Sequence, residues 1–450
     1  MSDCLLISAM KVSEIRAAAR IIRESVGIEA GDPVVAVASL RLIVRPEVME
    51  IMGAASTEAF ESMLQTIGEI RVTELPDHRV AELLGSRHGP ELPVPKIDPG
   101  TPEVGDKFDW HLRTCHFPEA WAQLHATDFG QIDWGSVLVG QIDTGFCEHP
   151  ALGFQGGVST TVNTALDKNY FQGDFSRPGY SVDDAHDPLA GAAYDGHGTR
   201  TGAVLAGYFV RQSLAGALNG YFGAAPQVPY VPARISNSVI VSDAQPALAE
   251  AITYLVSINC KVITLSMGFP LIPIFGGGVI PEVKRAINLA YDSGVILICA
   301  AGNVVSKVVA PAALNRTIAV GGSAQSDVPW IGSSCGPEVD LSAPAWPIYR
   351  ATMDRSGKPT YGFGDGTSFA TALTAGAAAL WLARHGNALQ AAYPQPWQRV
   401  AAFKKLVTAN ARVPAGGWDT THFGNGILNA DALLLASLPA ATSLRLEPPA

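Results

Sequence analysis

The chain has 450 residues, of which 48% are hydrophobic and 16% are charged, and its formal net charge is −10. This composition is typical of a folded globular protein and excludes a disordered, solvating chain. The acidic balance and the lack of a basic cluster exclude nucleic acid and anionic membrane surfaces as expected partners. No apolar run reaches the ~18 residues that a membrane-spanning helix needs.

Residues 1–85 are predicted to form a small α+β domain. Apolar side chains that recur every three or four residues indicate amphipathic helices. Short runs rich in Val, Ile and Leu indicate strands between them. The expected order is helix, strand, helix, strand, helix, over residues 12–26, 34–44, 57–67, 69–75 and 77–84.

A linker is predicted over residues 86–107, because its closely spaced prolines disfavour helix and favour an extended path. Residues 108–440 are then expected to form one large domain, and residues 441–450 a loose tail.

The large domain is predicted to have an α/β fold, doubly wound around a mostly parallel sheet. Short apolar runs without alternation are typical of strands that are buried on both faces of such a sheet. Helical stretches separate them, which is the alternation that this fold class produces. The expected strands cover residues 137–142, 262–265 and 295–298, and the expected helices cover 247–258 and 281–292.

Three short segments carry side chains suited to catalysis. Asp143 ends a predicted strand, and the carboxyl ends of parallel strands are where open α/β sheets place their sites. His197 lies between glycines before a helix of small residues over 201–207, and Ser368 precedes an alanine-rich helix over 372–384. A serine at a helix N-terminus has backbone N–H groups nearby that can bind a developing anion. Taken singly, each segment could equally be a turn, a loop or a helix cap.

The three residues together, in the order Asp143, His197, Ser368, resemble the subtilisin-like (subtilase) serine proteases, which have that chain order. The resemblance extends over most of residues 108–435. It includes Asp143-Thr144-Gly145, Gly196-His197-Gly198-Thr199, Gly223-Ala224-Ala225-Pro226, Leu265-Ser266-Met267-Gly268, Ala300-Ala301-Gly302-Asn303, Ser333-Ser334-Cys335-Gly336-Pro337 and Gly366-Thr367-Ser368.

The resemblance implies a role for each of four residues. Ser368 matches the nucleophile, which needs a base within hydrogen-bond reach because a serine hydroxyl is a weak nucleophile. His197 matches that base, and Asp143 matches the carboxylate that orients the imidazole. Asn303 matches the side-chain donor of the oxyanion hole, with the backbone N–H of Ser368 as the second donor.

The resemblance also implies where a polypeptide substrate binds. Ser266, Met267 and Gly268 match the edge segment on which substrates lie as an added antiparallel strand, with a partner segment near residues 235–242. Three small residues match one wall of the pocket for the residue before the scissile bond, namely Ala300, Ala301 and Gly302.

Four departures from the family pattern limit what can be transferred. Ala372 stands where most subtilisins have proline, and Arg200 replaces a frequent second histidine and adds positive charge. The loop over residues 304–310 is short, so substrate preference is not transferable. The family's calcium loop is barely recognisable around residues 214–222, and we therefore expect no metal and no cofactor.

The sequence therefore predicts a serine endopeptidase that acts on extended polypeptide. One alternative is a dedicated processing protease or transpeptidase for a single peptide or protein. Another is an inactive binding scaffold, against which the complete set of four catalytic residues argues. Residues 1–85 are either a prodomain that inhibits the same chain or an interaction module. Scattered cysteines without C-x-x-C pairs, and a start without a basic n-region, whose apolar run ends at Lys11, predict a cytoplasmic location.

Overall fold

The computed structural model describes residues 4–9, 34–38, 41–44, 56–65, 70–75, 108–124, 132–190, 194–207, 209–210, 220–221, 223–270, 278–303, 307–354 and 356–450. These residues belong to two compact units. One lies within residues 1–90, and the other contains all the described residues from 108 onward.

The first unit contains a four-stranded antiparallel sheet with the strand order β2-β3-β1-β4. Helix α3 (Thr57–Leu64) packs against β4 and buries Phe60 and Leu64. Ser56 caps this helix by accepting a hydrogen bond from the N–H of Ala59 at 3.2 Å. The strands are β1 (Cys4–Ala9), β2 (Val34–Ala38), β3 (Arg41–Val44) and β4 (Ile70–Leu75).

This sheet differs in two ways from the predicted order of elements. Strand β1 was not expected, and the single strand expected over residues 34–44 is two strands. The chain reverses direction between β2 and β3, because they pair antiparallel with Ala38 opposite Arg41. The helices expected over residues 12–26 and 77–84 lie outside the described residues.

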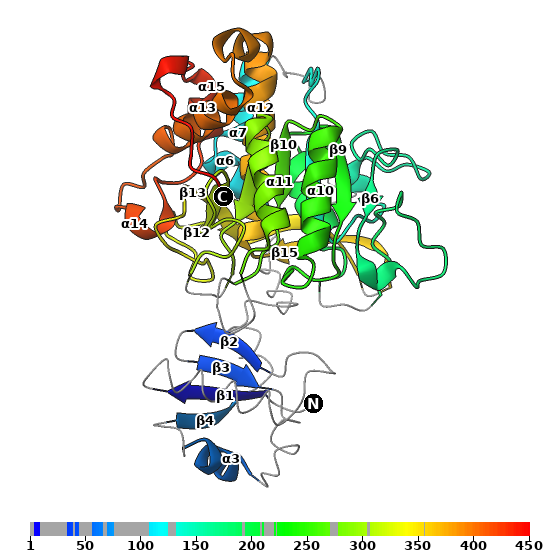
Figure 1. The fold of residues 1–450 in the computed structure, drawn as a ribbon, viewed down its shortest axis with the longest axis vertical. Coiled ribbons are helices and arrows are strands. Elements are labelled where there is room, and N and C mark those ends of the chain that lie inside the picture. The colour runs from blue at the N-terminus through cyan, green and yellow to red at the C-terminus, as the bar shows by residue number, and fades with distance from the viewer. Residues whose placement is uncertain are drawn as a thin grey trace, which may run out of the picture. The chain divides into compact units, whose positions relative to one another are not determined.

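The second unit is built on a seven-stranded sheet with the order β13-β12-β11-β10-β5-β9-β6, in which all neighbouring strands are parallel. Figure 1 shows helices on both sides of it. The predicted doubly wound α/β fold is therefore confirmed. The strands are β5 (Val139–Asp143), β6 (Lys168–Asn169), β9 (Tyr230–Arg234), β10 (Val262–Leu265), β11 (Ile296–Ala300), β12 (Ile318–Ala324) and β13 (Leu341–Trp346).

Burial of both sheet faces explains the apolar runs without alternation. Helices α10 (Gln245–Ser257) and α11 (Pro281–Asp292) lie side by side over one face (Figure 1). Ile263 and Leu265 of β10 point into the core beneath them. Val262 points into the opposite core, which contains residues of α8 (His197–Ala206) and α12 (Thr367–Ala392). Successive side chains of β10 therefore point to opposite faces of the sheet, and the side chains on both faces are buried.

Helix α12 is longer than expected and is interrupted. It begins at Thr367, directly before Ser368, and continues past the expected end at residue 384. Gly386 has non-helical backbone angles (φ 36°, ψ −116°) inside it. Only glycine adopts such angles readily, so the helix changes direction there.

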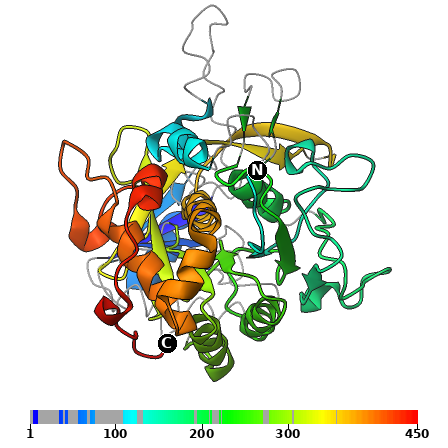
Figure 2. The same ribbon diagram turned by 90° about the horizontal axis from the view of Figure 1, so that it is seen from above.

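Short elements complete the second unit. The hairpin of β14 (Ile348–Met353) and β15 (Pro359–Gly364) is separate from the main sheet and is dark yellow in Figure 2. Strands β7 (Phe209–Val210) and β8 (Gly220–Tyr221) form a second small pair. The other helices are α6 (Trp110–Thr114), α7 (Phe117–Gln123), α13 (Pro396–Ala409), α14 (Thr420–Phe423), α15 (Ala430–Leu435) and 3₁₀ turns at Pro150–Leu152, Gln172–Asp174 and Ala441–Ser443.

The end of the chain, expected to be a loose tail, is attached to the second unit. Glu447 accepts a hydrogen bond from the backbone N–H of Arg316 at 2.9 Å and forms an ion pair with Lys404 at 3.3 Å. The N–H of Ala450 donates to Asn288 at 3.0 Å. The composition of residues 441–450 gave no sign of these contacts, because their partners lie far away in the sequence.

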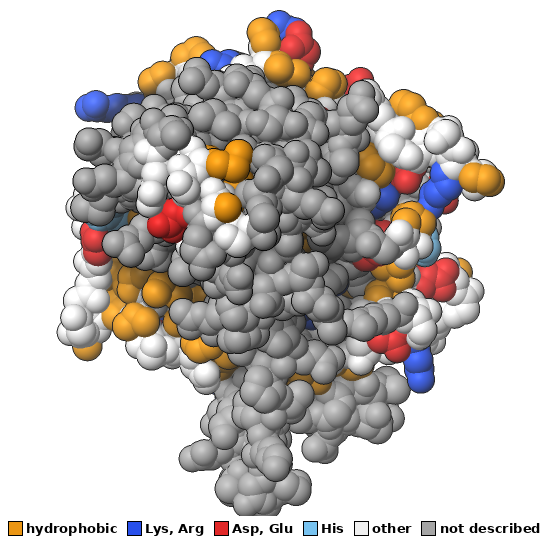
Figure 3. Space-filling view, turned by 90° about the horizontal axis from the view of Figure 1, so that it is seen from below, with side chains coloured by type: hydrophobic (Ala, Val, Ile, Leu, Met, Phe, Trp, Pro, Cys, Tyr) orange, Lys and Arg blue, Asp and Glu red, His pale blue; other side chains and the backbone are white. Residues whose placement is uncertain are grey.

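Charged groups are mixed over the surface. On the face shown in Figure 3, acidic and basic side chains of the described residues are interspersed and form no broad patch of one sign. None of the helices in the described part of the chain is both long and apolar enough to cross a membrane.

Candidate active site

The residues Asp143, His197 and Ser368 meet in one hydrogen-bonded chain. Asp143 ends β5, His197 begins α8, and Ser368 lies in the first turn of α12. The distance from His197 Nδ1 to Asp143 Oδ1 is 2.7 Å, and that from His197 Nε2 to Ser368 Oγ is 3.2 Å. Their exposed fractions are 1%, 7% and 5%. The fold thus brings together three polar side chains that the sequence places far apart.

The carboxylate of Asp143 is held in one orientation by the groups around it. Besides the imidazole, Oδ1 accepts the N–H of Thr144 at 2.7 Å, and Oδ2 accepts the hydroxyl of Thr201 at 3.0 Å. A carboxylate can only accept, so Nδ1 of His197 carries the proton. Nε2 is therefore free to accept the hydroxyl proton of Ser368.

Gly198 allows α8 to approach β5 closely. A Cβ atom at this position would lie 1.9 Å from the carbonyl oxygen of Gly145 and 3.2 Å from Cβ of Asp143. Gln141 of β5 stabilises the contact between the two elements. Its Nε2 donates to the carbonyl of Gly198 and to the hydroxyl of Thr201, both at 2.8 Å. His197 therefore reaches Asp143 because the next residue has no side chain.

A buried ion cluster lies beneath the turns that carry Asp143 and His197. Arg234, at the end of β9, donates its Nε to Asp174 at 2.8 Å and one Nη to the carbonyl of Thr144. Asp187 lies 3.8 Å from the same guanidinium and accepts the N–H of Gly196 at 2.8 Å. Burial raises the pKa of Asp187, while Arg234 and backbone N–H groups act in the opposite direction. The cluster connects the residue after Asp143 with the residue before His197.

Asn303 and the start of α12 border a small polar space. The N–H of Thr367 donates to Oδ1 of Asn303 at 2.9 Å, so the other atom of the amide group, Nδ2, is the free donor. A Cβ atom at Gly366 would lie 3.4 Å from that Nδ2 and 3.6 Å from the N of Ser368. Gly366 has φ +148° and keeps this space open. Both nitrogen atoms therefore lie within 4 Å of one point beside Gly366, and an oxyanion hole needs two such donors close together.

The segment Ser266, Met267, Gly268 follows β10 and contacts Ser368 directly. The carbonyl oxygen of Ser266 lies 3.2 Å from Ser368 Oγ, as an alternative acceptor for its single proton, and the hydroxyl of Ser266 donates to the carbonyl of Ser368 at 3.0 Å. Met267 is buried. Ser266 therefore braces the first turn of α12, in addition to the substrate contact expected from the sequence.

Gly268 is already paired with another segment of the protein. Its N–H donates to the carbonyl of Val239 at 3.0 Å, and its carbonyl accepts the N–H of Val241 at 3.1 Å. The expected partner segment over residues 235–242 therefore bonds to Gly268 itself. A substrate strand added at Gly268 would find its N–H and its carbonyl already hydrogen-bonded within the protein.

The small residues Ala300, Ala301 and Gly302 lie at the end of β11, next to α12. The N–H of Gly302 donates to the hydroxyl of Thr367 at 3.2 Å. Gly302 has φ +108°, and a Cβ atom there would lie 2.8 Å from Val309 and 2.9 Å from Ser334. The backbone of Ala301 pairs with Val320 and Val309. The loop of the family's calcium site, around residues 214–222, lies outside the described residues except for 220–221.

Several supporting residues were missed in the sequence. Thr201 follows His197 by four positions, and this spacing places both on one helix face, so it could have been found. Arg234 and Asp187 carried no local signal, because their partners come from distant loops.

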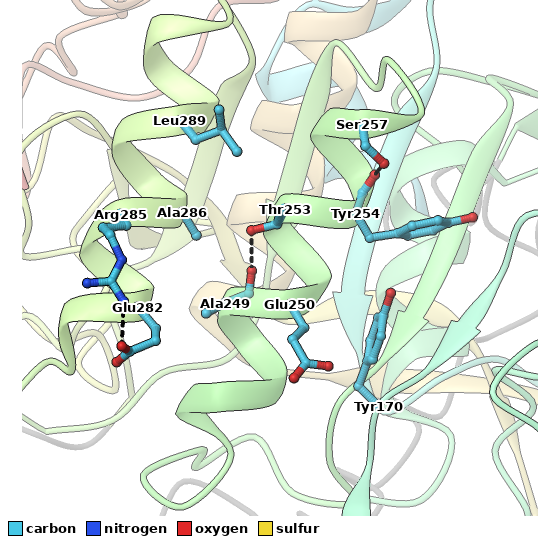
Figure 4. Close-up of a pocket in the computed structure, with 10 residues that line it drawn as sticks. All are labelled: Tyr170, Ala249, Glu250, Thr253, Tyr254, Ser257, Glu282, Arg285, Ala286 and Leu289. Atoms are coloured by element: carbon cyan, nitrogen blue, oxygen red, sulfur yellow. Dashed lines mark hydrogen bonds and ion pairs between the residues drawn. The ribbon is translucent and has the colours of Figure 1, made fainter.

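A separate groove lies on the outer surface of α10 and α11 (Figure 4). Its side chains include the ion pair of Glu282 with Arg285. None of the residues predicted for the active site lines it. The lining residues are Tyr170, Ala249, Glu250, Thr253, Tyr254, Ser257, Glu282, Arg285, Ala286 and Leu289.

Known proteins resemble this chain in sequence and in fold. The model of the subtilase family matches residues 135–426. Subtilisin E of Bacillus subtilis (strain 168) is 28% identical over 348 residues, which cover 75% of this chain and 76% of subtilisin E. The major intracellular serine protease of the same organism is 27% identical over 277 residues, 60% of this chain and 73% of that protein. The crystal structure of MycP1 with the N-terminal propeptide removed has a TM-score of 0.52 at 22% identity, and the match covers 73% of this chain and 98% of MycP1.

Proposed function

The chain belongs to the subtilase family of serine proteases, and on that premise we propose that Ser368 is the nucleophile with which it hydrolyses peptide bonds. The observation that carries the proposal is the continuous hydrogen-bond chain from Asp143 through His197 to Ser368. As a serine endopeptidase, the protein acts on polypeptide substrates.

The geometry supports acyl transfer in two steps. Ser368 Oγ attacks the substrate carbonyl carbon while its proton moves to Nε2 of His197, and Asp143 stabilises the imidazolium that forms. His197 then gives this proton to the leaving amine as the carbon–nitrogen bond breaks, which leaves an ester on Ser368. A water molecule attacks the ester with His197 again as base, and the acid product and the free serine are regenerated.

The oxyanion of each tetrahedral intermediate would accept hydrogen bonds from Nδ2 of Asn303 and from the N–H of Ser368. Two contacts support this role: the N–H of Thr367 donates to Oδ1 of Asn303, which fixes the amide group, and Gly366 has no side chain beside the two nitrogen atoms. Donors fixed in this way stabilise the transition state without a cost of reorganisation.

A fluorophosphonate probe tests the proposal, because labelling needs an activated serine. The wild type should be labelled, while Ser368→Ala and His197→Ala should not. Ser342→Ala is the matched control, since it removes a buried serine hydroxyl that donates to Phe423 outside the site. Equal labelling or equal proteolysis by the wild type and Ser368→Ala would refute the assignment. The absence of labelling in every variant, the wild type included, would indicate an inactive scaffold.

The N-terminal α+β domain is proposed to inhibit the protease of the same chain until it is cut away. Its position before the catalytic domain supports this reading, and the relative MycP1 has an N-terminal propeptide by its title. The competing reading is a permanent interaction module.

A cytoplasmic location is proposed as well. Five of the six cysteines, Cys115, Cys147, Cys260, Cys299 and Cys335, are free, and disulfides are rare in that compartment. Burial raises the pKa of Cys147 and Cys260 to about 12, which keeps these thiols protonated and unreactive. Fractionation of the host cell should recover the protein with cytoplasmic markers, and recovery from the medium would refute the location.

A further inference from the structure

Arg350, on β14, lies beside the nucleophile. Its guanidinium carbon is 5.8 Å from the centroid of the Phe369 ring, and Phe369 directly follows Ser368. The guanidinium also lies against Gly364 of β15, where a Cβ atom would be 2.4 Å from its Nε. The cation is therefore packed against the short segment 364–369 that contains Ser368.

The hairpin leaves space next to this cation. Arg350 lies opposite Gly362 in the β14–β15 register, and Gly364 shares that face of the hairpin because side chains alternate along a strand. A Cβ atom at Gly362 would meet none of the described atoms within 4 Å. The guanidinium of Arg350 fills the space beside Gly364, while the position at Gly362 is open, and an incoming group can approach Arg350 there.

The environment of Arg350 favours an anion. Its Nε is buried and has no hydrogen-bond partner among the described residues. Burial, and next the charge of Arg200, lower the pKa of Arg350 to about 9, while Asp365 acts in the opposite direction. Arg350 is therefore still a cation at neutral pH, and a second cation lies near it. A carboxylate would give this Nε a hydrogen-bond acceptor, and carboxylates pair with guanidinium in a bidentate geometry.

Arg350 lies on β14, which packs against α8, the helix that begins with His197. The oxyanion donor Asn303 and the brace Ser266 follow β11 and β10, on the acyl side. His197, which protonates the leaving amine, is on α8, and α8 packs against β14. Arg200 of the first turn of α8 donates its Nε to the hydroxyl of Thr352 on β14 at 3.1 Å. The two arginines therefore belong to the α8–β14 side of the site.

We propose that Arg350 binds a carboxylate of the substrate on the leaving-group side of the scissile bond. This carboxylate is either an acidic side chain within the first two residues after that bond or the carboxyl terminus of the substrate. The inference rests on the proposed function, because it takes Ser368 as the nucleophile. It makes Arg350 a specificity-determining residue for peptide-bond hydrolysis.

Internally quenched peptides test this assignment. One set shares an acyl segment and differs only in Glu, Gln or Lys as the first or second residue after the cleaved bond. A second set ends at those positions as free acid or amide. The wild type should have a kcat/KM about tenfold higher for the carboxylate member of a matched pair, the size of a charge-assisted hydrogen bond. Preference for Glu identifies the side chain, and preference for the free acid identifies the chain terminus.

The ratio within each matched pair should fall to about one in Arg350→Gln and fall only part of the way in Arg350→Lys, which keeps the charge but cannot form the bidentate pair. Arg285→Gln is the control, because it removes an exposed arginine on α11 that pairs with Glu282. Cleavage by the wild type without preference for a carboxylate overturns the inference even if Arg350→Gln fails to fold. So does an unchanged ratio in Arg350→Gln. If no peptide is cleaved and the fluorophosphonate probe labels nothing, the proposed function fails, and this inference fails with it.

Discussion

Thr201 is the residue that most directly controls the orientation of the catalytic carboxylate. Its hydroxyl donates to Oδ2 of Asp143 and accepts the amide N–H of Gln141. Without it, Oδ2 would have no hydrogen-bond donor among the described residues, and the carboxylate could rotate away from Nδ1 of His197. Hydrogen bonds to charged groups contribute about 1.5–3 kcal/mol, so the effect should be visible in the rate.

We predict that Thr201→Val lowers kcat by roughly tenfold or more and leaves KM nearly unchanged, because only the transition state depends on the imidazolium. Thr374→Val is the matched control. That threonine is also buried in a helix, but its hydroxyl donates to the carbonyl of Ala370 in its own helix at 2.9 Å. Steady-state kinetics with one peptide would check both variants, and equal kcat values would show that Thr201 does not position Asp143.

His111 is a buried base with no compensating contact. It lies in α6, it is 2% exposed, and neither ring nitrogen has a hydrogen-bond partner among the described residues. Burial lowers its pKa from 6.5 to about 3. The unfolded chain therefore takes up a proton at this histidine from about pH 6.5 downward, and the folded chain does not. Stability is lost as the pH falls through that range.

We predict that His111→Phe makes the free energy of unfolding less dependent on pH. Between pH 7 and pH 4.5, the loss should be about 2 kcal/mol smaller than in the wild type. Urea unfolding at the two pH values measures it. The exposed His422, which pairs with Asp419, provides the control variant His422→Phe. The same pH dependence in His111→Phe and the wild type would mean that another group carries it.

At the scale of elements, the pairing of Gly268 with residues 239–241 limits how a substrate strand can bind. The N–H and carbonyl of Gly268 are both engaged within the protein, whereas Ser266 still lies against the nucleophile. Strand addition gains affinity from main-chain hydrogen bonds. Where those bonds are already made, a longer substrate gains little.

We predict that kcat/KM rises by less than about fivefold when a substrate is extended from two to four residues on the acyl side, since even a single new hydrogen bond contributes only about 1 kcal/mol. A series of peptides with an identical leaving segment measures this. A rise of tenfold or more per residue would show that the segment 239–241 moves aside for the substrate. In that case, Val241→Pro, which removes the N–H that donates to Gly268, should increase the rise in kcat/KM per added residue.

The elements show what the sequence can and cannot predict. Helix α11 has the predicted bounds, and β10 agrees as well, because each is a periodic or uninterrupted apolar segment whose form depends on local pattern. Strand β1 and the division into β2 and β3 escaped prediction, since pairing partners decide them. In the site, Asp143, His197 and Ser368 were found through short motifs. The ion cluster of Arg234 was not, because only folding brings its members together.

At the scale of the whole molecule, the chain contains an N-terminal domain and a protease domain whose activity must be controlled before substrate binds. A serine endopeptidase that is active on synthesis would endanger its own cell. Inhibition by residues 1–85 would remove that danger, and cleavage of the chain after these residues would end the inhibition. The cut must then lie before the catalytic domain, which is predicted to begin at residue 108.

We predict that the wild type cuts itself between residues 83 and 106, while Ser368→Ala stays at the full 47.2 kDa. Residues 83–88 are the best substrate-like segment, because the prolines that follow lack the backbone N–H that a bound strand donates. Intact-mass spectrometry over time measures the cut, and a rate that does not change on dilution identifies it as intramolecular. A wild type that remains at full mass while it hydrolyses peptides would make the N-terminal domain a permanent module, because an inhibitor that is never released would leave no activity to measure.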